Sequence, residues 1–127
     1  DYTPVEVAQQ KIKKKEDHFN IELKKTTDIL ATLGKQKSVG QLLVGFALET
    51  TDEENYAKEK LKKKNLDLIV LNSLNDKGAG FKSETNKITI FNKALEKTAF
   101  ETKSKTDVAK DICAEILKLM NINNANL

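Results

Sequence analysis

The chain has 127 residues, 39% of them hydrophobic, which is enough for one domain with a core but not for two independent ones. All 22 basic residues are lysine and 19 residues are acidic, so the net charge is only +3 and no general attraction to nucleic acid follows from it. No apolar run approaches the roughly 20 residues that span a bilayer, and the single cysteine, Cys113, suits a reducing cytoplasm.

The N-terminal third predicts one strand between two helix starts. Residues 3–6 (TPVE) have the pattern of a helix start or a turn, with threonine as a possible cap, proline at the first helical position and glutamate three residues after the cap. Residues 18–24 alternate apolar and polar side chains, which indicates a half-buried strand, with His18 as a solvated side chain. Thr27 and Asp28 offer a cap for a short helix that ends near Gly34.

The middle of the chain predicts a strand, a helix and a second strand. Residues 41–48 (QLLVGFAL) form a short, continuous apolar run, typical of a central strand covered on both faces. Residues 51–54 (TDEE) form a capping-box pattern and predict a helix over residues 52–64. Residues 66–71 predict a second buried strand. This spacing indicates a βαβ unit with parallel strands in an α/β fold.

The C-terminal third begins with a predicted loop over residues 73–87, which is rich in turn-forming residues. Residues 87–91 and 99–102 predict a short antiparallel pair. Ser104 and Thr106 open a predicted amphipathic helix, on which Cys113 is expected to be a small buried side chain and after which residues 121–127 are expected to fray. The apolar face of this helix consists of Val108, Ile112, Ile116 and Leu119.

Residue patterns alone leave the function open. One histidine and one cysteine exclude a zinc cluster of ordinary composition, and the chain has neither a glycine-rich phosphate loop nor a histidine partner for a serine nucleophile. Lys60 and Lys64 are four residues apart on one helix face, where both could meet a polyphosphate, but a solvated helix surface gives the same pattern. The KIKKK run is equally compatible with solvent, and Phe46 with a core position.

Six strings in order carry a more specific signal: DYTPVEV, QQKIKKK, KKTTDIL, LLVGFALET, YAKEKLKKKNLDLIVLN and GAGFKSETNKITI. Together, from Asp1 to about Ile116, they strongly resemble the C-terminal part of the phosphopantothenoylcysteine synthetase domain of bacterial bifunctional coenzyme A biosynthesis proteins. The resemblance implies a Rossmann-like three-layer α/β fold with a mainly parallel sheet, incomplete at its N-terminal side. Residues 1–127 would be the C-terminal portion of one synthetase domain, with the family's glycine-rich loop and catalytic asparagine upstream.

The resemblance also implies an activity. Such a ligase uses CTP to activate the carboxylate of 4'-phosphopantothenate as an acyl-cytidylate, after which the amine of L-cysteine expels CMP. Mg²⁺ accompanies CTP, the enzyme is a homodimer, and FMN is expected only if a decarboxylase domain is fused upstream. Neither nucleic acid nor a membrane is an expected partner. The preference for CTP over ATP depends on the resemblance alone.

Carried over motif by motif, the resemblance assigns Asp1 to the nucleotide and its metal, and Lys11 to catalysis from the dimer partner. Three motifs depart from the family pattern: NPD is here Thr26-Thr27-Asp28, VGFAAET is VGFALET, and AND is Leu71-Asn72-Ser73. The alternatives are a catalytically incomplete dimerising fragment or a basic binding module. The implied nucleotide-binding residues are Asp1, Lys11, Thr27, Asp28, Ile29, Leu30, Phe46, Lys60 and Lys64.

Overall fold

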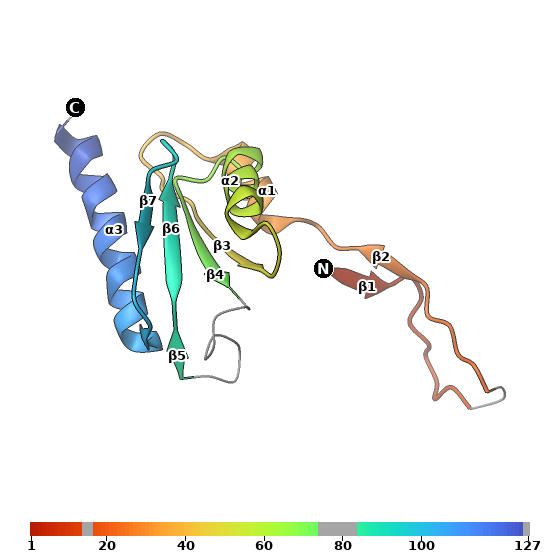
Figure 1. The fold of residues 1–127 in the computed structure, drawn as a ribbon. Coiled ribbons are helices and arrows are strands. Elements are labelled where there is room, and N and C mark those ends of the chain that lie inside the picture. The colour runs from red at the N-terminus through yellow and green to blue at the C-terminus, as the bar shows by residue number, and fades with distance from the viewer. Residues whose placement is uncertain (14–16, 74–83, 126–127) are drawn as a thin grey trace.

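The computed structural model describes residues 1–13, 17–73 and 84–125 (Figure 1). A four-stranded sheet in the order β3-β4-β6-β7 forms the centre of the body, and two small two-stranded sheets, β1-β2 and β5-β8, accompany it. In chain order the elements are β1 (Tyr2–Pro4), β2 (Leu23–Lys25), α1 (Ile29–Gln36), β3 (Val44–Glu49), α2 (Glu53–Lys63), β4 (Leu68–Ser73), β5 (Thr85–Asn86), β6 (Ile88–Asn92), β7 (Lys97–Ala99), β8 (Lys103–Ser104) and α3 (Lys105–Ala125).

The predicted βαβ unit is confirmed. β3 and β4 are parallel, with Phe46 opposite Val70, and α2 connects them. β6 then pairs antiparallel with β4, and β7 antiparallel with β6. The α/β class is therefore confirmed, but the described sheet is mixed and has one parallel pair, so the expected mainly parallel sheet is not what these strands form. Parallel neighbours need a crossover connection, and among the described strands of this sheet only β3 and β4 are joined by a helix.

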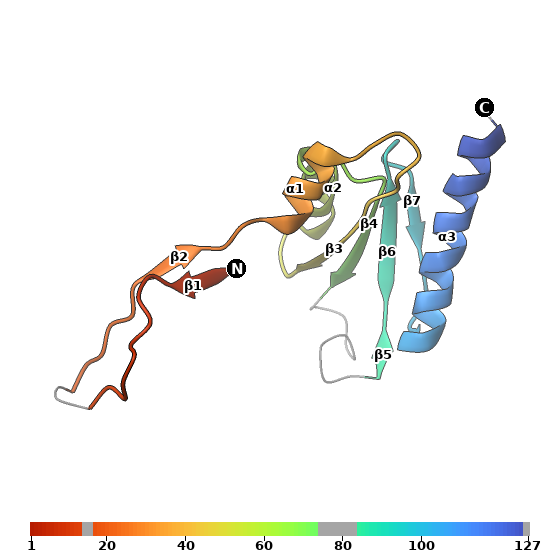
Figure 2. The ribbon, with the colours of Figure 1, turned by 180° about the vertical axis from the view of Figure 1, so that it is seen from behind.

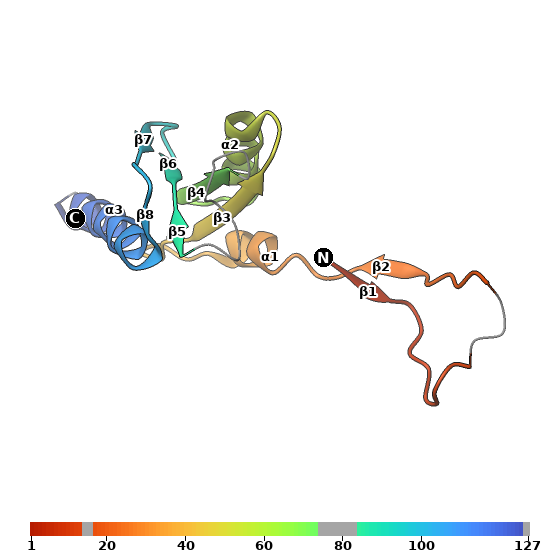
Figure 3. The same cartoon turned by 60° about the horizontal axis from the view of Figure 1, so that its bottom comes forward.

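The body has three layers, with helices on both faces of the sheet (Figures 2 and 3). On one face, α2 packs through Ala57 and Leu61 onto Ile69 and Phe91, and Leu30 of α1 joins the edge of this cluster. The other face is covered by α3. The predicted apolar stripe of α3 is confirmed, because the side chains that pack there on Leu68, Val70, Ile88 and Ile90 are Val108, Ile112, Ile116 and Leu119.

The end of α2 is fixed by a Schellman turn. Asn65 has a positive φ of 54°, which asparagine tolerates better than most residues. The N–H of Leu66 bonds the carbonyl of Leu61 at 2.9 Å, and the N–H of Asn65 bonds the carbonyl of Lys62 at 3.2 Å. Leu61 and Leu66 are both fully buried in the same cluster. The turn therefore sets where Lys64 stands relative to the sheet.

The start of α2 differs from its prediction. The helix begins at Glu53, but its N-cap is Asp52 in a left-handed conformation, and this side chain makes no capping hydrogen bond. Instead Oδ1 of Asp52 accepts a hydrogen bond of 2.7 Å from the side-chain amide of Asn55. The predicted capping box is therefore wrong, although the helix boundaries are correct to within one residue.

The helix start that residues 3–6 suggest is not formed. Residues 2–4 form β1, not the first turn of a helix, and they pair antiparallel with β2. Val5 and Thr26 extend this pairing through backbone hydrogen bonds of 3.0 Å to Glu22 and Asp1. β2 is only three residues long, so the predicted strand over residues 18–24 forms only at its end, and His18 is an exposed side chain outside any strand. We call residues 1–13 and 17–25 the arm, because in Figures 1 and 3 they project away from the body.

Three further expectations need correction. β3 is an edge strand among the described strands, and Phe46 on it is 68% exposed, so neither the central position nor the core position holds. Cys113 is exposed, because it lies on α3 beside the stripe that faces the sheet and not within it. α3 continues through Ala125, so residues 121–125 of the segment expected to fray are helical, and residues 126–127 lie outside the described residues.

The remaining strand predictions differ in detail. The antiparallel pair is confirmed as β6 and β7, with the second strand at residues 97–99 instead of 99–102. Of the predicted loop over residues 73–87, the part at residues 74–83 lies outside the described residues. Within the part of the chain that the structure describes, no helix is both long and apolar enough to cross a membrane.

Candidate functional site

A cavity of about 390 Å³ lies where α2 meets the end of β3 and the start of α1. Acidic side chains, lysines and one tyrosine line it. Its lining consists of Asp28, Glu49, Tyr56, Glu59, Lys60, Lys63 and Lys64. Three of the predicted site residues, Asp28, Lys60 and Lys64, are therefore brought together from two separate parts of the sequence.

Lys60 reaches from α2 to the last residue of β3. Its ammonium donates a hydrogen bond to Oε1 of Glu49, and the two form an ion pair. Glu49 faces α2 because alternate residues of β3 point to opposite sides of the sheet. Ala47, two residues earlier, is buried in the cluster beneath α2. The carboxyl end of β3 thus places a carboxylate inside the cavity.

Lys64 pairs with a carboxylate on the opposite wall. Its Nζ lies 3.0 Å from Oδ2 of Asp28. Asp28 is also the N-cap of α1, where its Oδ1 accepts a 3.0 Å hydrogen bond from the N–H of Ala31. Both contacts lower the pKa of the Asp28 carboxyl below its ordinary value of 3.8. The backbone hydrogen bond from Ala31 has the larger effect, and the side-chain hydrogen bond from Lys64 comes second. Lys60 and Lys64 are therefore each paired with a carboxylate that lines the same cavity.

Close backbone packing holds α1 against the end of α2. A Cβ on Gly34 would lie 1.9 Å from the carbonyl oxygen of Lys64, so only glycine permits this approach. The side-chain amide of Asn65 donates a 2.9 Å hydrogen bond to the carbonyl of Gly34. The relative positions of Asp28 and Lys64 therefore follow from a tight contact between the two helices.

A second ion pair fixes the other end of α1. Nζ of Lys37 lies 2.8 Å from Oδ2 of Asp67, and the two side chains are only 11% and 15% exposed. The same Oδ2 accepts a 2.7 Å hydrogen bond from the N–H of Leu43, just before β3. Lys37 also donates to the carbonyl of Asn65 at 2.8 Å. This cluster ties α1 to the starts of both parallel strands.

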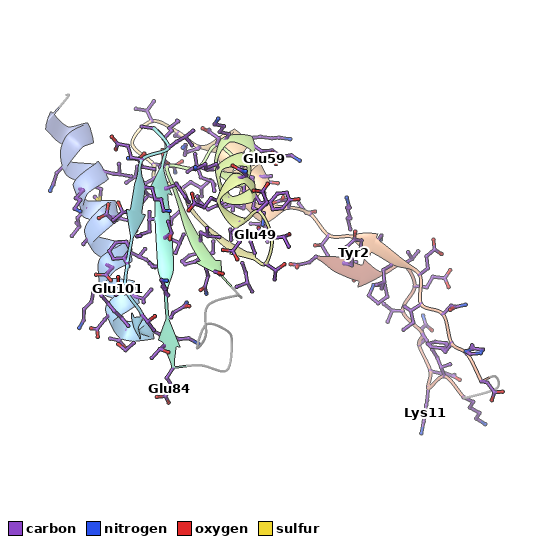
Figure 4. All side chains as sticks on the ribbon, in the orientation of Figure 1. Tyr2, Lys11, Glu49, Glu59, Glu84 and Glu101 are labelled. Atoms are coloured by element: carbon purple, nitrogen blue, oxygen red, sulfur yellow. The ribbon has the colours of Figure 1, made fainter. Side chains whose placement is uncertain are left out.

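The other predicted residues lie outside the cavity. Thr27 and Ile29 are exposed beside Asp28, while Leu30 packs against the core. Phe46 lies on the opposite face of the sheet from Ala47 and α2. Figure 4 shows Lys11 at the far end of the arm, well away from Glu49 and Glu59. Asp1 is exposed at the start of the arm, and nothing in the described chain tests its role as a metal ligand.

Asn72 is a candidate that sequence reasoning missed as a site residue. It lies opposite Leu48 near the carboxyl end of the parallel pair, on the same sheet face as Phe46. Its Oδ1 is buried and has no hydrogen-bond partner among the described residues. A buried polar atom without a partner is unusual in a folded protein and marks a place where a ligand donor could be accepted. The available signal was an asparagine directly after the apolar run LIVL.

The described residues contain no group of three or more histidine, cysteine, aspartate or glutamate side chains that could hold a metal ion. Mg²⁺ in nucleotide sites is typically held by substrate phosphates, waters and only one or two carboxylates. The residues present therefore fit a metal that is bound with a nucleotide better than one held by a complete protein cage.

Comparisons with known proteins agree with the motif resemblance. A family model described as the DNA/pantothenate metabolism flavoprotein C-terminal domain matches residues 1–120. A prokaryotic protein of unknown organism, named cysteine/cysteine sulfinic acid decarboxylase, is 54% identical over 121 residues, which are 95% of this chain and 34% of that one. The coenzyme A biosynthesis bifunctional protein CoaBC of Bacillus subtilis (strain 168) is 49% identical over 119 residues, which are 94% of this chain and 29% of that one.

A solved structure gives the same result in three dimensions. The crystal structure of the C-terminal domain of the bifunctional protein CoaBC matches with a TM-score of 0.67 and 39% sequence identity, over 79% of this chain and 48% of that chain. Fold and cavity together define an α/β domain with paired lysines at the end of a βαβ unit. The chain belongs to the DNA/pantothenate metabolism flavoprotein C-terminal domain family, and its resemblance to the synthetase part of bifunctional CoaBC is confirmed. It spans about a third of the length of these two curated relatives.

Proposed function

We propose that these residues form part of a CTP-dependent phosphopantothenate–cysteine ligase of coenzyme A biosynthesis, as the C-terminal portion of one synthetase domain. The observation that carries this proposal is the cavity at the carboxyl end of β3, in which Lys60 and Lys64 point at the same space from one helix. Ligands of open α/β sheets bind at the carboxyl ends of parallel strands. Lysine is a compact cation suited to the phosphates of a nucleotide.

The proposed reaction needs cations more than it needs a nucleophile on the enzyme. Attack of the phosphopantothenate carboxylate on the α-phosphate of CTP forms an acyl-cytidylate and releases pyrophosphate, and the cysteine amine then expels CMP. Charge gathers on the reacting phosphorus and on the departing pyrophosphate. Lysines placed there stabilise the transition state more than the ground state. Mg²⁺ bound with CTP would add further positive charge, with Asp1 as its proposed protein ligand.

The remaining proposed residues complete the nucleotide site. The segment from Thr27 to Leu30 would line the cytidine pocket beside the Asp28 cap, and Phe46 would contact the nucleotide from the other face of β3. We add Asn72 to this set, because its buried Oδ1 lacks a partner among the described residues and the side chain lies on the sheet face of Phe46. Lys11 would act on the phosphates and the acyl intermediate of a neighbouring subunit, which the projecting arm supports.

The first test is nucleotide binding by lysine variants. Lys60→Met and Lys64→Met should each weaken CTP binding by about 1.5 to 3 kcal/mol, the usual worth of a charge-assisted hydrogen bond. Isothermal titration calorimetry with CTP, ATP, GTP and UTP measures both the loss and the base preference. Lys62→Met is the matched control, because Lys62 is an exposed lysine on the same helix that does not line the cavity. Equal CTP affinity in all three variants and the parent would contradict the proposal.

A second function, a dimerising module without catalysis, is favoured by one observation. The arm encloses an apolar-walled pocket of about 560 Å³ whose lining includes Val7, Ile12 and Phe19, all largely exposed in the single chain. Such a surface is typical of a segment that another protein chain covers. Self-association without CTP binding would favour this function over the ligase. A basic binding module has no comparable support.

A further inference from the structure

The ion pair between Glu49 and Lys60 is asymmetric in burial. The side chain of Glu49 is 17% exposed, whereas that of Lys60 is 41% exposed. Glu49 is the last residue of β3 and stands in register with Ser73 of β4, so its backbone is fixed by the parallel ladder. Lys60 is carried on a long, flexible stem from the surface of α2. The lysine can therefore turn to another anion in the cavity, while the carboxylate stays where it is.

We propose that Glu49 competes with the bound anion for Lys60 and so sets the selectivity of the cavity for highly charged phosphates. The inference rests on the proposed function, because it concerns the same cavity. When Lys60 turns to a ligand, the half-buried Glu49 carboxylate loses its cation and also faces a new anion. Both effects oppose binding. A polyphosphate, with several charges and several oxygens to share among lysines, can offset this cost, whereas a small anion cannot.

Asp28, the partner of Lys64, is expected to compete less strongly with a bound anion than Glu49 does. Its carboxylate also caps α1 through the N–H of Ala31, and its side chain is 51% exposed. Solvent screening makes its charge a weaker competitor than the charge of Glu49. When Lys64 moves away, Asp28 still accepts the hydrogen bond from the N–H of Ala31. Glu49 is therefore the residue on which we place the selectivity.

Glu59 provides a matched control. It lines the same cavity, it is exposed on α2, and its side chain forms no hydrogen bond or ion pair in the part of the chain that the structure describes. Figure 4 shows Glu49 and Glu59 on the same side of the body. Glu59→Gln removes the same unit of charge from the cavity without releasing a lysine. It therefore measures the general effect of lowering the negative charge.

The experiment compares the parent chain with Glu49→Gln, Glu59→Gln, Lys60→Met and the double variant Glu49→Gln/Lys60→Met. Isothermal titration calorimetry with inorganic tripolyphosphate, orthophosphate and CTP gives the affinities at fixed ionic strength. Glutamine keeps the size and one acceptor oxygen of glutamate. We expect Glu49→Gln to bind tripolyphosphate about threefold to tenfold more tightly, the range for a partly exposed charge pair. The relative gain for orthophosphate should be larger, so discrimination between the two anions falls.

The controls separate this inference from the general proposal. Glu59→Gln should show a smaller gain, and the double variant should bind no better than Lys60→Met. Unchanged or weaker tripolyphosphate binding by Glu49→Gln would overturn the inference, while CTP binding that depends on Lys60 would leave the proposed function standing. A third outcome is possible: Glu49→Gln binds tripolyphosphate more tightly, this gain requires Lys60, and the chain does not bind CTP. That outcome would support the inference and contradict the nucleotide assignment. Absence of tripolyphosphate binding in every variant would overturn both.

Discussion

At the scale of residues, the sequence predicted which lysines share a helix face but not what they meet. Lys60 and Lys64 are four residues apart, which places them together on any helix. Their partners are distant in sequence, because Glu49 comes from the end of β3 and Asp28 from the cap of α1. Asn72 was missed for a related reason, since its lack of a partner is a property of the folded environment. The motif resemblance identified the family, whereas the spacing of the lysines alone left the function open.

Gly34 carries a testable consequence at this scale. Gly34→Ala places a Cβ against the backbone carbonyl of Lys64, which cannot move without disturbing the Schellman turn. We expect the free energy of unfolding to fall by about 1 to 3 kcal/mol, as for other overpacked contacts, and CTP affinity to fall with it. Urea denaturation followed by circular dichroism measures the stability. Lys35→Ala, at an exposed position on the same helix, should cost far less, and an equal loss in both variants would contradict the contact.

At the scale of elements, prediction succeeded where local pattern and tertiary position agree. The βαβ unit and the stripe of α3 were found because their periodicities come from burial on one face. β1 was missed because its strand state depends on pairing with β2, about twenty residues later, and its local sequence has the marks of a helix start. The position of β3 at an edge also could not be predicted, since neighbours in a sheet are long-range contacts.

The cluster around Asp67 supports a prediction at this scale. Lys37→Met removes the only ammonium that the described structure pairs with Asp67 and leaves that carboxylate half-buried beside the N–H of Leu43. The free energy of unfolding should fall by about 1 to 3 kcal/mol, because a nearly buried charge loses its partner. Thermal and urea unfolding measure the change.

The double variant Lys37→Met/Asp67→Asn supplies the control. Asparagine removes the unpaired charge but keeps an oxygen that can accept from Leu43. It should recover part of the lost stability. A double variant that is less stable than the single Lys37→Met chain by the full cost of a second independent mutation would contradict the proposed pairing.

At the scale of the whole molecule, the projecting arm leads to a prediction about how the proposed site is completed. Lys11 lies far from the cavity of its own chain, so the expected contact with the nucleotide requires a second copy. We therefore expect a two-fold dimer in which each arm serves the neighbouring site. This prediction rests on the projecting arm and on the family resemblance.

Complementation tests the exchange of arms. In a protein in which these residues are joined to the rest of a synthetase domain, Lys11→Ala and Lys60→Met should each abolish most ligase activity. Mixed dimers of the two variants should regain a fraction of the parent activity, because one of their two sites has both lysines. Pyrophosphate release, measured on heterodimers purified with two affinity tags, reports the rescue. Verified heterodimers without activity would show that Lys11 acts within its own subunit or not at all.

We also expect the arm and the body to respond differently to protein concentration. Its ladder has three residue pairs, and its apolar side chains, including Phe19 and Ile21, are largely exposed in the single chain. A two-stranded ribbon of this size is marginally stable by itself in water. A second chain that covers those side chains stabilises the ordered arm by mass action, whereas the body retains its own core. We therefore expect the order of residues 1–13 and 17–25 to increase with protein concentration, and dilution to remove Lys11 from the neighbouring site while the cavity stays folded.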